Sequence, residues 1–563
     1  MNQQYNIWKQ MFAIISLMMM VEGSVKMNPI VRTTSGTLVG ETIQLANGDR
    51  VNRFLGVPYA MPPLGSNRFE KPIPVTNQTD SIVYAQQSMP MCVQMRHMWK
   101  TISPLLDVDR NHNISEDCLY LNIYIPANAK QSNLPVMVWL PGEGFDFADA
   151  RQFNGAYLAS MGQVIVITVQ YRVGVFGFLK PNLGLWDQVV ALQWIRSNVA
   201  ELGGDESNVT LFGRFSGSMS ISILMASPIA IQSPTPLFNR AILMSGIAVG
   251  NWVFDKRHDD KVRQVMTDVG CTSFECLRSL PMERLVAASG YGWKPTIDRE
   301  LITDEPMNAL SNGHFPKYVN SVMLGTNQFE GNLCLLKHLV VDRSFYSKLV
   351  HNNVSTSEYE KAIREDLQMF YGDDGEVLGK RDQQQRYSLI TDRSMYVEFC
   401  SELLINSHMR QYKDLLSNVA RSDEYQLMDV VNYKLDYRPS FSIAPKFINS
   451  SIHGDDVILA FGLAFTNQSE RRISADDQTM SRMMVNLFSN FARNGAQLDD
   501  DSVEIRLHQQ SAIDSMSMFS MKMTQHFAFT FACGIMMMVM VALIILVLRQ
   551  RTNISYMKHQ IES

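Results

Sequence analysis

Residues 209–217 form the run Val209-Thr210-Leu211-Phe212-Gly213-Arg214-Phe215-Ser216-Gly217. The apolar start of this run predicts a strand, the two flanking glycines permit a strained turn, and residues 218–225 can continue as a buried helix. Such a turn projects its central side chain away from the backbone, and that residue here is Phe215. A phenyl ring has no proton to surrender and no lone pair to attack a carbonyl, so covalent acyl transfer by Phe215 is excluded.

The neighbouring hydroxyl of Ser216 is a poor substitute. A shift of the motif by one residue places Arg214 and Ser218 where glycines are needed. An adjacent residue on so tight a turn also points in another direction. We therefore do not assign Ser216 as a nucleophile.

Further motifs on both sides of this turn extend the pattern along the chain. They are Arg53-Phe54-Leu55-Gly56-Val57-Pro58-Tyr59-Ala60, Glu116-Asp117-Cys118-Leu119-Tyr120-Leu121-Asn122, Tyr171-Arg172-Val173-Gly174-Val175-Phe176-Gly177-Phe178 and Gly203-Gly204-Asp205. These motifs occur in the same order as in the type-B carboxylesterases, cholinesterases and neuroligins, and the chain resembles that family over about residues 29–495. The resemblance implies an α/β-hydrolase fold, with a mostly parallel central sheet flanked by helices.

The resemblance also carries over two further catalytic positions. Glu330, within residues 325–331, matches the acid of a Ser-His-acid triad, and His453, at the start of residues 453–456, matches its base. Phe215 leaves this pair without a serine to activate. Either the pair activates water directly and gives weak hydrolysis, or it is a mutually satisfied buried pair. We favour the second interpretation, because deleting one partner of a buried polar pair costs about 1–3 kcal/mol.

The oxyanion loop departs from the family pattern as well. Where esterases of the family have His-Gly-Gly-Gly-Phe, this chain has Pro141-Gly142-Glu143-Gly144-Phe145. The resemblance places the oxyanion donors at Gly142, Glu143, Gly144 and Ser216. Glu143 adds a side chain to a loop that needs open backbone, and if ionised it would repel an oxyanion. Two separate losses favour a non-enzyme, a pseudoenzyme of the family.

Segments at both ends indicate a membrane-anchored protein of the secretory pathway. Residues 1–23 have the pattern of a signal peptide, with Lys9 before a short apolar run. Residues 24–505 are the expected carboxylesterase-like extracellular domain and residues 506–526 a stalk. Residues 527–548 are uncharged and long enough to span a bilayer, and basic residues follow in the tail, residues 549–563. We therefore expect a type I protein.

Seven cysteines fit an oxidising compartment. By the resemblance, Cys92 pairs with Cys118 and Cys271 with Cys276. Cys400 matches a family cysteine whose usual partner lies near the end of the domain, where this chain has none, and Cys334 is the candidate left. N-glycosylation sequons lie at Asn77, Asn113, Asn208, Asn353, Asn449 and Asn467.

The predicted function combines these observations. The formal charge of −5 and the lack of a long basic run argue against a nucleic-acid partner. No cofactor or metal is expected. The disabled nucleophile, altered loop and anchor resemble the neuroligins, gliotactins and neurotactins. The resemblance implies a non-catalytic plasma-membrane protein that acts in cell adhesion or as a receptor for an extracellular or membrane protein. Neuronal or junctional contacts are the sites that it suggests.

Alternatives stay open at this point. One is a membrane-anchored carboxylic ester hydrolase with an atypical mechanism, and another is a ligand-binding pseudoenzyme. Residence in a secretory or lysosome-related membrane is the alternative location. The helix through which the family forms a homodimer has no counterpart in the sequence after residues 491–495, so the resemblance leaves a homodimer unsettled.

Overall fold

The structure is a computed structural model of the chain. It describes the following residues: 28–76, 78, 80–95, 113–249, 253–371, 390–421, 428–466, 473–495 and 504–508. The chain divides into the units Met1–Arg506 and Leu507–Ser563. The predicted signal peptide, membrane span and tail lie outside the described residues, as do Asn77 and Asn467. Within the described ranges, no helix combines the length and apolar character needed to cross a bilayer.

The described residues form a ten-stranded sheet in the order β15-β14-β13-β12-β11-β9-β10-β8-β4-β3, of which every strand but β15 lies wholly within the first unit. Its strands are β3 Glu41–Gln44, β4 Arg50–Pro58, β8 Tyr120–Pro126, β9 Leu134–Leu140, β10 Ile165–Val169, β11 Gly204–Arg214, β12 Arg240–Met244, β13 Ser321–Asn327, β14 Asp429–Asp436 and β15 Glu504–His508. From β10 through β14 neighbouring strands are parallel, whereas β3, β4, β8 and β10 pair antiparallel. The predicted mostly parallel sheet is confirmed.

Two smaller sheets, the α-helices, the 3-10 helices η1 Gly65–Asn67 and η4 Leu463–Phe465, and the π-helix η3 Glu402–Asn406 complete the described secondary structure. The small sheets are β1 Ile30–Thr33, β2 Gly36–Val39 with β5 Ile82–Tyr84, and β6 Met91–Cys92 with β7 Ile114–Ser115. The α-helices are α3 Ala156–Gly162, α4 Gly174–Phe178, α5 Leu183–Asn198, α6 Ser216–Ala226, α7 Pro228–Ile231, α8 His258–Asp268, α9 Phe274–Ser279, α10 Met282–Ser289, α11 Pro306–Ser311, α12 Asn332–Val341, α13 Arg343–Val350, α14 Thr356–Tyr371, α16 Arg393–Ser401, α17 Ser407–Ala420, α18 Asp455–Ala460 and α19 Ala475–Asn494.

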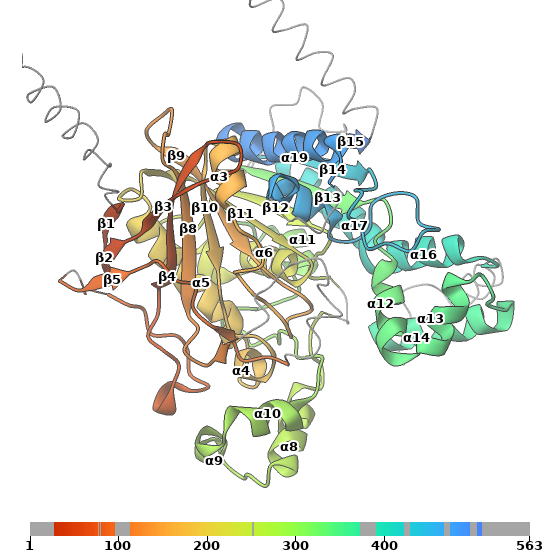
Figure 1. The fold of residues 1–563 in the computed structure, drawn as a ribbon. Helices are drawn as coiled ribbons and strands as arrows, with labels where there is room; N and C mark the ends of the chain where they lie inside the picture. The colour runs from red at the N-terminus through yellow and green to blue at the C-terminus, as the bar shows by residue number, and fades with distance from the viewer. Residues whose placement is uncertain are drawn as a thin grey trace, which may run out of the picture. The chain divides into compact units, whose positions relative to one another are not determined.

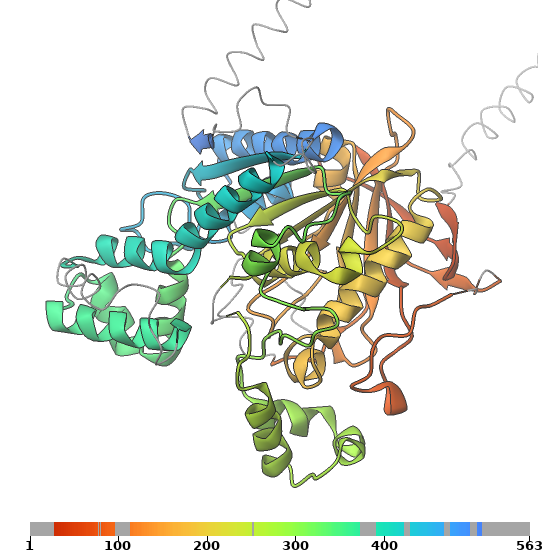
Figure 2. The ribbon, with the colours of Figure 1, turned by 180° about the vertical axis from the view of Figure 1, so that it is seen from behind.

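Helices cover both faces of the large sheet (Figures 1 and 2). α3 and α19 lie on one face, and α5 and α6 lie on the other. Strands buried on both faces need apolar side chains at every position. Accordingly β9, with the sequence Leu-Pro-Val-Met-Val-Trp-Leu, is buried along its whole length. Trp139 of β9 contacts the rings of Phe212 and Phe461 beneath α19.

The register of the parallel strands brings distant loops together at one edge. Leu140 of β9 lies opposite Gly213 of β11, and Arg214 lies opposite Met244 of β12, which in turn lies opposite Gly325 of β13. The carboxyl ends of these strands therefore meet at one edge, where α/β folds place their ligand sites.

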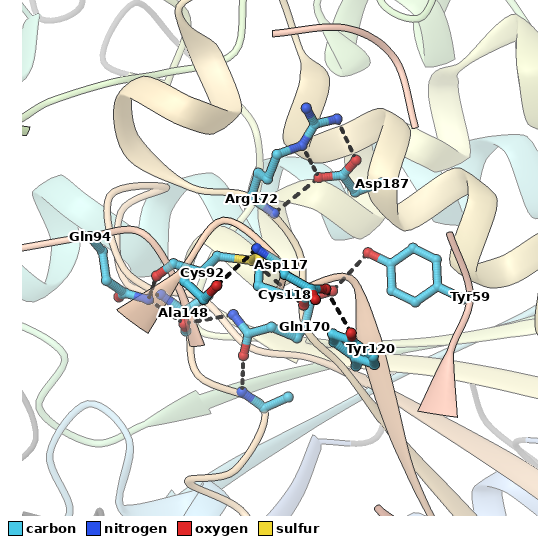
Figure 3. Close-up of a disulfide and its surroundings, with 12 residues drawn as sticks. Tyr59, Cys92, Gln94, Asp117, Cys118, Tyr120, Ala148, Gln170, Arg172 and Asp187 are labelled. Carbon is cyan, nitrogen blue, oxygen red and sulfur yellow. Dashed lines mark hydrogen bonds and ion pairs between the residues drawn. A yellow bond between two sulfur atoms is a disulfide. The ribbon is translucent and has the colours of Figure 1, made fainter. Parts of the chain in front are cut away.

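Three disulfides join described residues: Cys92–Cys118, Cys271–Cys276 and Cys334–Cys400. Figure 3 shows the first, beside Gln94 and Gln170. Gln94 donates to the carbonyl oxygen of Ala148 at 2.8 Å and accepts from its amide at 3.2 Å, and Gln170 donates to the same carbonyl at 3.1 Å. The disulfide loop therefore supports the backbone that follows the predicted oxyanion loop.

Candidate active site

Phe215 occupies the turn between β11 and α6. Its backbone angles are φ 50° and ψ −114°, a conformation that costs a non-glycine residue about 1–3 kcal/mol. Gly217 makes the turn sterically possible, because a Cβ atom there would lie 2.0 Å from the carbonyl oxygen of Leu140. The strained turn of the hydrolase motif is thus present, with a phenyl ring on it.

Glu330 and His453 come together beside this turn. The Nδ1–H of His453 donates to Oε2 of Glu330 at 2.7 Å, and the carboxylate is fully buried. Glu330 also accepts from the backbone amide of Asn327 at 2.6 Å and from the hydroxyl of Ser245 at 2.7 Å. Burial raises the pKa of Glu330, but the bond and charge of His453 and the other donors outweigh burial, so its pKa lies below the ordinary value.

The other ring nitrogen of His453 faces no hydrogen-bonding group of the described chain. Its Nε2 atom is buried and has no hydrogen-bond partner among the described residues. The ring of Phe215 lies edge-to-face against the imidazole, with the centroids 5.3 Å apart and an interplanar angle of 83°. With the Nδ1–H group donating to Glu330, Nε2 is the ring nitrogen left to accept a proton. The base is oriented as in a triad, but a phenyl ring stands where a hydroxyl would be.

Ser216 does not replace the missing nucleophile in this arrangement. Its Oγ is buried and, like Nε2 of His453, has no partner among the described residues, so the two atoms are not hydrogen-bonded to each other. The hydroxyl lies instead against Gly142, where an added Cβ would come within 2.3 Å of it. The sequence-based decision against Ser216 therefore agrees with this geometry.

The loop after β9 folds back on itself. The amide of Glu143 donates to the carbonyl oxygen of Phe147 at 2.9 Å, and the amide of Phe147 donates to the carbonyl oxygen of Glu143 at 3.3 Å. Gly144 lies beside Phe215, since a Cβ on it would be 3.8 Å from the phenyl ring. Ser216 is the first residue of α6, where amides have no partner within the helix. Gly144 and Ser216 are thus the better candidates for oxyanion donors, because the amide of Glu143 is already bonded.

The side chain of Glu143 forms an ion pair with Arg214, the residue before Phe215. These side chains are only 13% and 12% exposed. Arg214 also lies against Gly454, where a Cβ would be 2.0 Å from Nη1. Burial lowers the pKa of Arg214 to about 10, against the opposing effect of nearby carboxylates, so the guanidinium is charged at neutral pH. Glu143 was expected from the sequence to repel an oxyanion, and this expectation is corrected because Arg214 offsets its charge.

A second buried acid follows the histidine. Asp455 accepts from the amide of Ile452 at 3.0 Å and from the hydroxyl of Ser442 at 2.9 Å. Burial nevertheless raises its pKa to about 7. No role was predicted from the sequence for Arg214, Asn327 or Asp455. Their only signal there is a position within the motifs that match the triad.

The predicted glycosylation sites fall into two groups in the described residues. Asn113, Asn353 and Asn449 are exposed. Asn208 is partly buried, and its amide group bonds to Arg240 and to the carbonyl oxygen of Arg493. Glycosylation itself stays a prediction at each sequon.

Comparison with known proteins places this site in a family context. Residues 27–529 match the model of the Carboxylesterase family. The chain is 31% identical to Carboxylesterase 5A of Felis catus over 526 residues, which cover 86% of this chain and 89% of that protein. It is 30% identical to Carboxylesterase 1C of Mus musculus over 83% of this chain and 85% of that protein. Liver carboxylesterase 1 of Oryctolagus cuniculus is 29% identical over 83% of this chain and 86% of that protein.

These relatives overturn one prediction. The chain was expected to be a non-catalytic pseudoenzyme, yet relatives at about 30% identity over most of its length are named carboxylesterases and point to an esterase. The resemblance to neuroligins, gliotactins and neurotactins is not confirmed by these matches. The chemistry of Phe215 is unaffected by these matches, since a phenyl ring cannot form an acyl-enzyme.

Proposed function

The chain belongs to the carboxylesterase family, and we propose that it hydrolyses carboxylic esters by an atypical route in which His453 and Glu330 activate water directly. The observation that carries this proposal is the 2.7 Å bond from Nδ1 of His453 to Glu330, together with the unpartnered Nε2 of the same ring. A histidine that a buried carboxylate orients can act as a general base on a water molecule that lies within hydrogen-bond reach of its other ring nitrogen.

The proposed reaction proceeds without an acyl-enzyme, that is, without a covalent bond between substrate and protein. Nε2 of His453 takes a proton from water while the water oxygen attacks the ester carbonyl, and Glu330 stabilises the imidazolium that forms. The amides of Gly144 and Ser216 are the donors we assign to the oxyanion. The tetrahedral intermediate collapses by breaking the bond to the alcohol oxygen, which takes the proton back from Nε2. The products are a carboxylic acid and an alcohol.

Phe215 sets the rate limit of this route. Nε2 is buried in the structure and the phenyl ring packs against the imidazole, so water reaches the base only when the ring turns aside. Base catalysis contributes about 10²–10⁴-fold, and the covalent route is lost, so we expect slow turnover.

The test is hydrolysis of a panel of short and long acyl esters by the purified full-length protein. We expect turnover above the buffer rate, no initial burst, no labelling by a fluorophosphonate, and loss of about 10²-fold or more in His453→Ala and Glu330→Gln. Phe215→Ser should gain a burst and fluorophosphonate labelling. Wild-type turnover that is absent, or that persists unchanged in His453→Ala, refutes the proposal.

We further propose that this activity is displayed on the outer side of the plasma membrane, anchored by residues 527–548. The support is the uncharged composition of that segment and the basic residues after it. Surface biotinylation of intact cells tests the location. Exclusive recovery of the protein from internal membranes would favour the secretory or lysosome-related alternative.

A further inference from the structure

The start of α12 directly follows the acid Glu330 and contacts both α16 and the base. The amide of Gly331, the residue after Glu330, donates to the hydroxyl of Ser401 in α16 at 2.8 Å. The side-chain oxygen of Asn332 accepts from the backbone amide of His453 at 2.9 Å. One short segment, residues 331–332, is therefore bonded to α16 on one side and to the backbone of the base on the other.

Contact between this segment and α16 is close. A Cβ atom on Gly331 would lie 2.0 Å from the carbonyl oxygen of Val397 and 2.8 Å from Cβ of Cys400. The backbone beside the acid thus rests directly on α16, with no space for a side chain between them. Because no side chain lies between the two backbones, a movement of α16 displaces the backbone next to Glu330 directly.

A disulfide joins the same two helices one turn further along. Cys334 of α12 and Cys400 of α16 are both fully buried and bonded to each other. Asp366 lies close to both sulfur atoms, but its carboxylate pairs with Lys337 and Tyr396. Sulfurs joined to each other are not thiolate ligands, so the group is a covalent link and not a metal site. The sequence alone had left the partner of Cys400 open.

We propose that the Cys334–Cys400 disulfide and Asn332 are positioning residues for the Glu330–His453 pair. The disulfide fixes α12 on α16 and so places the loop that bears Glu330, while Asn332 holds the backbone of His453 at the distance that the 2.7 Å bond requires. Displacement of a reacting group by about 1 Å can cost 10²-fold in rate. The effect on ester hydrolysis rests on the proposed function; the effect on the geometry of the pair does not.

The experiment uses full-length protein carrying Phe215→Ser, whose introduced hydroxyl reports on the base through fluorophosphonate labelling. Into this parent we introduce Asn332→Leu, which removes the acceptor, Asn332→Asp, which keeps one, and the double change Cys334→Ala with Cys400→Ala. The control removes a different disulfide, Cys271–Cys276, whose second cysteine lies in α9. The rate constant of labelling and its final extent are measured separately, and wild-type ester hydrolysis is measured in parallel.

We expect the labelling rate constant to fall about 10- to 100-fold in Asn332→Leu and in the Cys334/Cys400 double variant. It should stay within about threefold of the parent in Asn332→Asp and in the Cys271/Cys276 control. A purely structural role would lower the final extent, through loss of folded protein, and leave the rate constant unchanged; that result overturns the inference. An equal fall in the control overturns it as well.

The outcomes also separate this inference from the proposed function. If the parent labels and the positioning variants label slowly while the wild-type protein hydrolyses no ester, the inference holds and the proposed function fails. If the parent is not labelled at all, the inference is overturned, because the pair then has no reactive geometry to preserve.

Discussion

Removing either partner of the Glu143–Arg214 ion pair should destabilise the protein, and removing Arg214 should cost more than removing Glu143. Both side chains are about nine-tenths buried, and removing one partner of a buried pair costs about 3–5 kcal/mol because the other charge is left uncompensated. Some solvent reaches both groups, so for Glu143→Ala we expect about 2–3 kcal/mol. Arg214→Met should cost more, about 3–5 kcal/mol, since Glu330, Asp455 and Asp456 also act on the guanidinium.

Chemical denaturation of the two single variants and the double variant measures this directly. The cost of the double variant should fall short of the sum by about 2 kcal/mol, which is the coupling between the two side chains. Glu143→Gln serves as a control that keeps the shape of the side chain without its charge. Coupling below about 0.5 kcal/mol, or a larger cost for Glu143→Ala than for Arg214→Met, would refute the reasoning.

Three further predictions concern stability. Asp455 has a pKa of about 7 in the folded protein against an ordinary 3.8. Its contribution to the free energy of unfolding is therefore fully present below about pH 4 and is lost as the pH rises through 7. Asp455→Asn should flatten the fall in unfolding free energy over that window, which is on the order of 1.4 kcal/mol per pH unit, and an unchanged slope would contradict this. Gly217→Ala should cost more than about 3 kcal/mol or abolish soluble expression, because its Cβ would lie 2.0 Å from the carbonyl oxygen of Leu140; wild-type thermal stability would show that the turn is not so constrained. Loss of the Cys334–Cys400 disulfide, whose cysteines are 66 residues apart, should lower the unfolding free energy by about 4 kcal/mol in the chain-entropy model, and a midpoint of denaturation equal to wild type would contradict it.

The fold and the order of the catalytic positions were predictable because their signals are local. The fold was expected from the resemblance to a known family, and the motifs that carry that resemblance, including the glycines around Phe215 and the segments that contain Glu330 and His453, each lie within a few residues of sequence. The inactivity inferred from the same motifs was wrong by the evidence of the relatives, because a missing nucleophile excludes one mechanism and not every hydrolytic one.

Other features of the site were not predictable from the pattern. Asn332 carries no sequence signal of its own, and its bond to the amide of His453 appears only when β13 and the loop before α18 are placed side by side. The partner of Cys400 was likewise open in the sequence, because distance along the chain does not fix which cysteines meet.

The sequence by itself determined that position 215 carries no nucleophile, since the reactivity of a side chain is a property of its own atoms. Only the tertiary structure decided that the charge of Glu143 is offset by an ion pair with Arg214. Leu140 of β9 lies opposite Gly213 of β11, so the loops after these two parallel strands emerge together and bring Glu143 to Arg214. The physical reason is that the electrostatic effect of a charge depends on its neighbours in space, and strand register, not separation along the chain, sets those neighbours.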